Sequence, residues 1–120
     1  FLIQVRTVCR LLCSNALSLP EVRQHLAAQQ LEAVVEPAPG TDEPGLVRLE
    51  VPAGLQLSLE NLAAEFGAYK QVPALHRGRP LKYVFVVDHP DQPFMCGLVA
   101  EKHRREPTVQ AVTVRRDIRL

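Results

Sequence analysis

The chain has 120 residues, of which 47% are hydrophobic and 22% are charged, and 14 Lys and Arg side chains nearly balance 13 Asp and Glu. This composition is typical of one globular domain and excludes a disordered chain, a collagen-like fibre and a coiled coil. No apolar run approaches the roughly 20 residues that a membrane-spanning helix needs. Three cysteines fit no disulfide scaffold, so we expect a cytoplasmic protein. The first residue, Phe1, is not methionine, which favours a single compact domain, residues 1–120, cut from a longer protein.

The stretch Leu2–Cys13 has mostly apolar residues at its odd positions, whereas Gln4, Arg6 and Arg10 occupy even ones. A period of two predicts a strand with one face in water. In a strand Cys9 and Cys13 lie about 13 Å apart along the chain, too far to share a metal ion. In a helix the same spacing would bring the two thiols together.

A helix is predicted after Ser18, because Ser18 and Glu21 form a capping box around Pro20, and this helix ends near Gln30. Alternation then predicts short strands at residues 31–35 and 47–51. An acidic loop rich in proline and glycine, residues 37–45, connects them.

A second helix is predicted from Ser58 to Tyr69, where apolar residues recur at spacings of three and four. The run Leu81–Val87 is β-branched and aromatic with little alternation, which is typical of a strand covered on both faces. Two more strands are expected at residues 95–100 and 109–118. The order β-α-β-β-α-β-β-β predicts an α+β, ferredoxin-like split βαβ (βαββαβ) two-layer sandwich with an additional C-terminal β-hairpin.

Charge is divided unevenly along the chain, although the net charge is small. Residues 1–69 carry twice as many acidic as basic side chains, and residues 70–120 carry twice as many basic as acidic ones. Basic loops and a basic C-terminal strand can contact phosphates of RNA or DNA, or an acidic protein surface. The candidate binding residues are Arg77, Arg79, Lys82, Lys102, Arg104, Arg105, Arg115 and Arg116.

Asp88, His89 and Asp91 follow the strand that ends at Val87, where metal-dependent phosphate enzymes often place a carboxylate. The same residues are also good turn formers, and the sequence identifies no acid on another strand that would complete a metal site with them. We therefore expect a structural turn here and assign no catalytic residue, metal or cofactor.

The sequence contains no glycine-rich phosphate loop, no Gly-x-Ser-x-Gly elbow and no His-Glu-x-x-His helix. We therefore expect a non-catalytic interaction or accessory domain that docks to a protein partner or self-associates through charged surfaces. The alternative is a nucleic-acid-binding module that uses the basic loops and the C-terminal strand. A third reading is a metal-dependent nuclease or phosphotransfer enzyme centred on Asp88. None of these readings involves a membrane.

Overall fold

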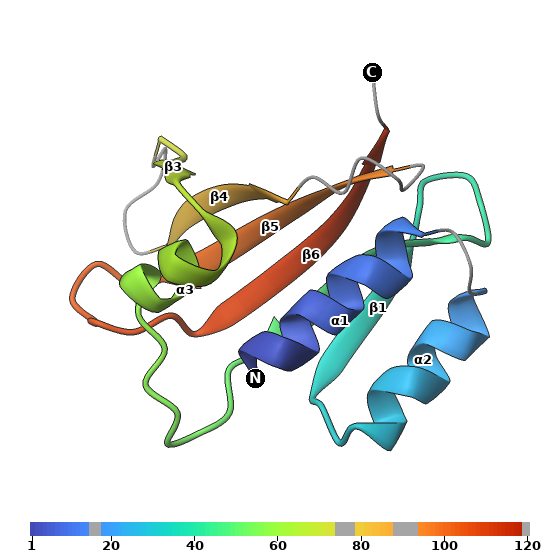
Figure 1. Ribbon diagram of the computed structural model, residues 1–120, viewed down its shortest axis with the longest axis horizontal. Coiled ribbons are helices and arrows are strands. Elements are labelled where there is room, and N and C mark those ends of the chain that lie inside the picture. The colour runs from blue at the N-terminus through green and yellow to red at the C-terminus, as the bar shows by residue number, and fades with distance from the viewer. Residues whose placement is uncertain (15–17, 74–78, 88–93, 119–120) are drawn as a thin grey trace.

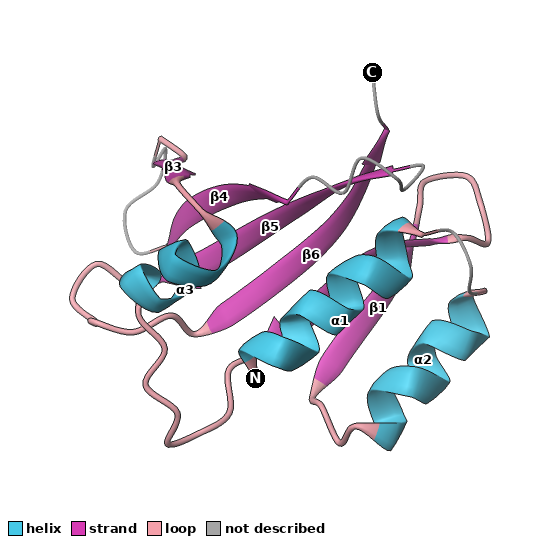
Figure 2. Ribbon diagram, viewed as in Figure 1, coloured by secondary structure: helices cyan, strands magenta, loops and turns pink. Residues whose placement is uncertain are grey.

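The computed structural model describes residues 1–14, 18–73, 79–87 and 94–118. The described part has an α+β architecture, in which helices and a six-stranded antiparallel sheet form two layers (Figures 1 and 2). In chain order the elements are α1 (Leu2–Cys13), α2 (Leu19–Ala28), β1 (Ala33–Pro37), β2 (Pro44–Glu50), α3 (Leu59–Phe66), β3 (Tyr69–Gln71), β4 (Leu81–Val87), β5 (Phe94–Lys102) and β6 (Ala111–Ile118).

The sheet has the strand order β1-β2-β6-β5-β4-β3, and every pair of neighbours is antiparallel. Strands β3 to β6 form a meander, whereas β1 and β2 form a hairpin that joins the meander only through β6. The expected ferredoxin-like arrangement is not confirmed. A helix stands where its first strand was predicted, and the strand order gives a different sheet topology.

The N-terminal segment Leu2–Cys13 is a helix, so the predicted strand is wrong. The residues it buries are Val5, Val8, Cys9, Leu12 and Cys13, which recur at helical spacings of three and four. Two of them, Val8 and Leu12, fall on even positions, and an extended chain would have turned them toward water. Burying them together with Val5 and Cys9 requires the helical period, which decides the conformation.

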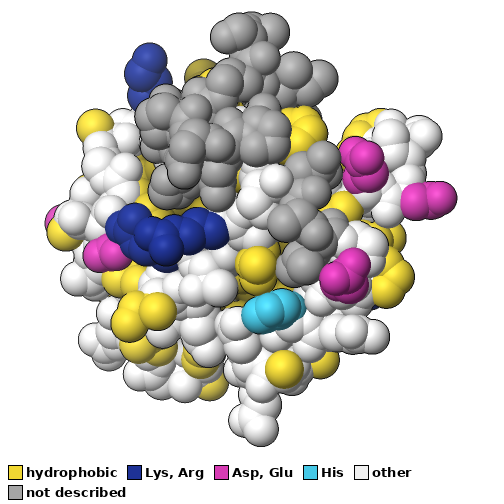
Figure 3. Space-filling view, turned by 45° about the vertical axis from the view of Figure 1, so that its right-hand side comes forward, with side chains coloured by type: hydrophobic (Ala, Val, Ile, Leu, Met, Phe, Trp, Pro, Cys, Tyr) yellow, Lys and Arg dark blue, Asp and Glu magenta, His cyan; other side chains and the backbone are white. Residues whose placement is uncertain are grey.

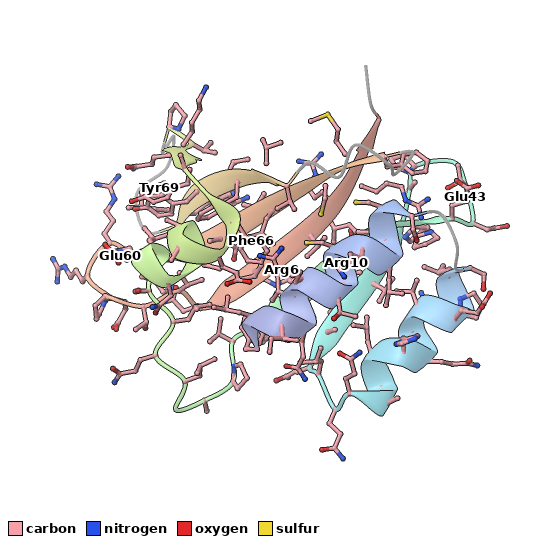
Figure 4. All side chains as sticks on the ribbon, in the orientation of Figure 1. Arg6, Arg10, Glu43, Glu60, Phe66 and Tyr69 are labelled. Atoms are coloured by element: carbon pink, nitrogen blue, oxygen red, sulfur yellow. The ribbon has the colours of Figure 1, made fainter. Side chains whose placement is uncertain are left out.

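Helix α1 is fixed at its N-terminal half to α3. Arg6 donates from Nε and Nη2 to Glu65 Oε1 at 3.0 and 2.7 Å, and from Nη2 to the Glu65 carbonyl at 2.8 Å. The Arg6 guanidinium also lies 5.2 Å from the ring centroid of Phe66, toward which Figure 4 shows it directed. These contacts join two helices that are far apart in sequence.

The other two helices begin where their caps predict. The Ser18 capping box forms, and Ser58 makes an equivalent one with Asn61 in place of an acid. Helix α3 ends at Phe66, earlier than expected, because Gly67 adopts a φ of 96°, which side-chain-bearing residues rarely adopt. Tyr69, predicted to be helical, instead begins the short edge strand β3.

The core lies between the helices and one face of the sheet. Side chains on this face include Val47, Leu49, Phe85, Leu98 and Val114, all of them fully buried. The opposite face is not covered by a helix in the described part of the chain (Figure 1). The expectation that Leu81–Val87 is covered on both faces is therefore wrong, and Val86 is 57% exposed. Among the described residues, no helix is long and apolar enough to cross a membrane.

Candidate functional site: the open face of the sheet

The uncovered side of the sheet, called here the open face, presents its side chains in three rows that cross the strands. The strand register defines the rows, because residues paired on neighbouring strands point to the same side. The first row is Glu36, Leu46, Arg115, Gly97 and Val86. The central row is Val34, Arg48, Thr113, Val99, Val84 and Lys70. The third row is Glu50, Ala111, Glu101, Lys82 and Val72, the last placed by its backbone hydrogen bond to Lys82.

The open face is hollowed and partly apolar. A hollow of about 680 Å³ extends from β1 to β4 and is lined by Val34, Leu46, Val84 and Val99 together with charged residues of both signs. Val34 on β1, which lines the hollow, is 56% exposed, and Val86 on β4 is 57% exposed. An antiparallel sheet that simply faces water is expected to carry polar residues there, so these two valines make the open face a candidate site.

An ion-pair network crosses the middle of the open face. Arg48 on β2 donates to Glu50 Oε1 at 3.1 Å and reaches across β6 to Glu101 Oε2 on β5 at 2.8 Å. The hydrogen bond that Arg48 donates to Glu101 is the main cause that raises the pKa of Arg48. By register, Ala111 of β6 lies between Glu50 and Glu101, and its small side chain leaves room for the bridge. The ion pair of Arg48 with Glu101 therefore links β2 to β5 across β6.

Two other charges on the open face lack such partners. Lys82 on β4 is exposed, and so is Glu36 on β1. Neither forms an ion pair with any residue that the structure describes. They line opposite sides of the hollow, so each is available to a group of opposite charge on a partner.

The basic residues singled out in the sequence do not converge on one surface. Lys82 and Arg115 lie on the open face, but in different rows. Arg79, Arg104 and Arg105 are exposed outside the strands. Lys102 donates from Nζ to the carbonyls of His103 and Glu106 at 3.3 and 2.9 Å, which closes the turn after β5. Arg77 lies outside the described residues, as do Asp88, His89 and Asp91.

Arg116 is directed into the protein rather than toward a partner. Its side chain is only 4% exposed, and Nε donates to the Leu12 carbonyl at 2.7 Å. The guanidinium stacks 4.6 Å from the Phe94 ring centroid, and Nη1 lies 3.7 Å from Glu43 Oε2. Neither Nη1 nor Nη2 makes a hydrogen bond in the described structure. Burial lowers the pKa of Arg116, and Glu43 opposes this effect.

The three cysteines gather between α1 and β5. Cys9 and Cys13 lie one helical turn apart, and the Cys13 thiol donates to the Met95 carbonyl at 3.5 Å, beside Cys96. Hydrogen bonding to Cys13 and then to Cys9, together with burial, raises the pKa of the Cys96 thiol. A buried thiol with a raised pKa stays protonated and is a poor nucleophile. No group of three or more His, Cys, Asp or Glu among the described residues is placed to hold a metal ion.

The side of the molecule with α1 and α2 offers no comparable concentration of features. In Figure 3, charged side chains of both signs are distributed among apolar and uncharged atoms on the described part of that side. Figure 4 places Glu43 in the loop between β1 and β2, on the far side of α1 from Glu60 and Tyr69.

No known family model, curated protein or solved structure matches this chain. The open face is thus assigned from its own residues.

Sequence reasoning missed the apolar residues of the open face, Val34, Leu46, Val84, Val86 and Val99. The available signal was the unbroken apolar run in Leu81–Val87, which was interpreted as burial on both faces. On a sheet covered on one face only, such a run leaves apolar side chains such as Val86 exposed.

Proposed function

We propose that this domain is a non-catalytic interaction module that docks a protein partner through the open face of its sheet. The observation that carries the proposal is the exposure of Val34 and Val86 on a hollowed face that helices leave uncovered. Covering each valine removes apolar surface from water, which stabilises a complex by about 25 cal/mol per Å². The charges around the hollow then fix the orientation of the partner.

Nucleic-acid binding, the alternative, receives less support from the same face. Proteins that bind single strands stack bases on aromatic side chains, and the three rows of the open face contain none. Tyr69 and Tyr83 instead pack against each other on the helix side, with ring centroids 5.5 Å apart. Glu36, Glu50 and Glu101 also offset the basic residues of this face, so it carries no concentrated positive charge for phosphates.

Site-specific photo-crosslinking tests the proposal. A photoreactive residue replaces Val86 in one variant and Ile3 in a matched control, and both proteins are produced in their native cells and irradiated. Ile3 is an apolar residue on α1 that is 81% exposed, so it controls for non-specific contact. We expect a discrete protein adduct from position 86 only. Absence of an adduct at position 86, or equal adducts at both positions, would overturn the proposal.

A further inference from the structure

We infer that the partner docked on the open face is a second copy of this chain, related by a two-fold axis that runs parallel to the strands between β6 and β5. The inference rests on the proposed docking function and adds the identity and orientation of the partner. In such a dimer the strands at opposite sides of the two sheets face each other, so β2 of one copy lies over β4 of the other. Likewise, β6 lies over β5.

The twist of the sheet permits this arrangement. A twisted sheet is saddle-shaped. A two-fold rotation about an axis along the strands gives a saddle that curves in the same directions as the first. Two open faces related in this way can follow each other at the even separation of about 10 Å that packed sheets adopt. In this arrangement, long side chains of one copy, such as Lys82, reach into the hollow of the other.

The strand register supplies the complementarity. Within the third row, Glu50 on β2 comes opposite Lys82 on β4 of the second copy. Within the first row, Leu46 comes opposite Val86. Because the interface is two-fold symmetric, each of these favourable contacts occurs twice. Lys82 thus meets an acid that already pairs with Arg48, and Leu46 and Val86 cover each other. In the central row Arg48 comes opposite Val84 and Lys70 opposite Val34, so the favourable contacts lie in the two outer rows.

The other aligned arrangement is less favourable. With the axis perpendicular to the strands, each strand lies over its own copy and the first row faces the third. Leu46 then comes opposite Glu50, and Val86 comes opposite Lys82. The central row would also face itself, with Arg48 against Arg48 and Lys70 against Lys70. These like charges would repel each other and Lys82 would gain no acid, so the axis parallel to the strands is favoured.

The size of the face predicts a weak dimer. Six strands that each occupy about 4.8 Å cover about 29 Å, and three rows that each occupy about 6.8 Å extend about 20 Å along the strands. The resulting footprint of about 580 Å² is below the roughly 800 Å² per partner of a standard stable interface. We therefore expect a weak, transient dimer.

Sedimentation velocity between about 5 µM and about 1 mM tests this dimer, with concentrations chosen to bracket a weak interface. The variant Lys82→Glu sets an acid against Glu50 in both symmetric contacts, and we expect it to raise the dimer dissociation constant about tenfold or more. The double variant Lys82→Glu with Glu50→Lys restores opposite charges and should recover most of the affinity. Arg104→Glu, an equal charge change on an exposed turn outside the open face, is the control and should leave dimerisation unchanged.

Each outcome decides the inference. Dimerisation that is lost in Lys82→Glu and recovered in the double variant supports it, with circular dichroism showing that every variant is folded. A monomer throughout the concentration range overturns it, as does a dimer that is insensitive to Lys82→Glu. A crosslink from position 86 to a different protein, combined with a monomer in sedimentation, would overturn the second copy while leaving the proposed docking function standing.

Discussion

Arg116 gives a sharp test of the electrostatics of the interior. The perturbation is the replacement Arg116→Met, which keeps an unbranched stem and removes the charged guanidinium. The guanidinium contributes one short hydrogen bond to the Leu12 carbonyl and stacking on Phe94. Against this stands the burial of Nη1 and Nη2 without hydrogen-bond partners in the described structure.

The two sides of this balance are of similar size. A charged hydrogen bond contributes about 1.5 to 3 kcal/mol, and a buried cation over an aromatic ring about 2 kcal/mol. Each unpartnered buried polar group costs about 1 to 3 kcal/mol. Glu43 adds little, because its carboxylate is exposed and lies 3.7 Å away. We expect Arg116→Met to change the free energy of unfolding by no more than about 1 kcal/mol.

The assay is urea unfolding followed by circular dichroism, with Arg116→Ala as the matched variant. Alanine removes the stem as well as the charge and leaves a cavity, so it should cost about 2 to 4 kcal/mol. A loss above about 3 kcal/mol in Arg116→Met would refute the reasoning, because it would mean that the guanidinium is fully satisfied. Equal losses in the two variants would show that packing of the stem is unimportant.

Three further predictions concern stability and reactivity. Phe85→Ala should destabilise the domain by about 3 to 5 kcal/mol, because Phe85 is buried on the helix side of the sheet. Val86→Thr, on the open face, should change the stability of the monomer by less than about 0.5 kcal/mol. Both values are measured by urea unfolding at low protein concentration, and similar losses would contradict the assignment of the two residues to opposite faces. Hydrogen bonds from Ser18 lower the pKa of Glu21 below its usual 4.5. The stability that these bonds give the folded domain is therefore fully present above pH 4.5, and it is lost as the pH falls through the lower pKa that Glu21 has in the folded state. Ser18→Ala should therefore be destabilising at pH 7, and the difference should shrink in acid unfolding; a difference independent of pH would exclude the linkage. The three cysteines should react slowly with a thiol reagent at pH 8 in the native protein and rapidly in denaturant, and fast native labelling of Cys96 would disprove its raised pKa.

Local chemistry explains which elements could be predicted from the sequence. The capping residues Ser18 and Ser58 act on their own backbone, so the starts of α2 and α3 followed directly from the sequence. The N-terminal helix was missed because its apolar residues satisfy periods of two and of 3.6 over much of Leu2–Cys13. Only the sheet that Val8 and Leu12 pack against decides between them, and that sheet forms from residues far along the chain.

The strand order and the open face depend on the same long-range information. Nothing local in β6 indicates that it lies between β2 and β5 rather than at an edge. Nor does the sequence of Leu81–Val87 reveal that helices cover only one of its faces. The candidate site was therefore not predictable from the sequence, although the apolar run in Leu81–Val87, which supplies Val84 and Val86, had been noted.

The central position of β6 has a consequence for how the domain is made. The hairpin of β1 and β2 and the meander that starts at β3 share no strand pairing with each other, and β6 alone joins them. During synthesis the ribosome releases both halves before the strand that unites them, so the sheet closes only when residues 111–118 have emerged. The open face spans both halves and is completed at that moment. In the proposed docking function, a partner would therefore find its full surface only after residues 111–118 have paired.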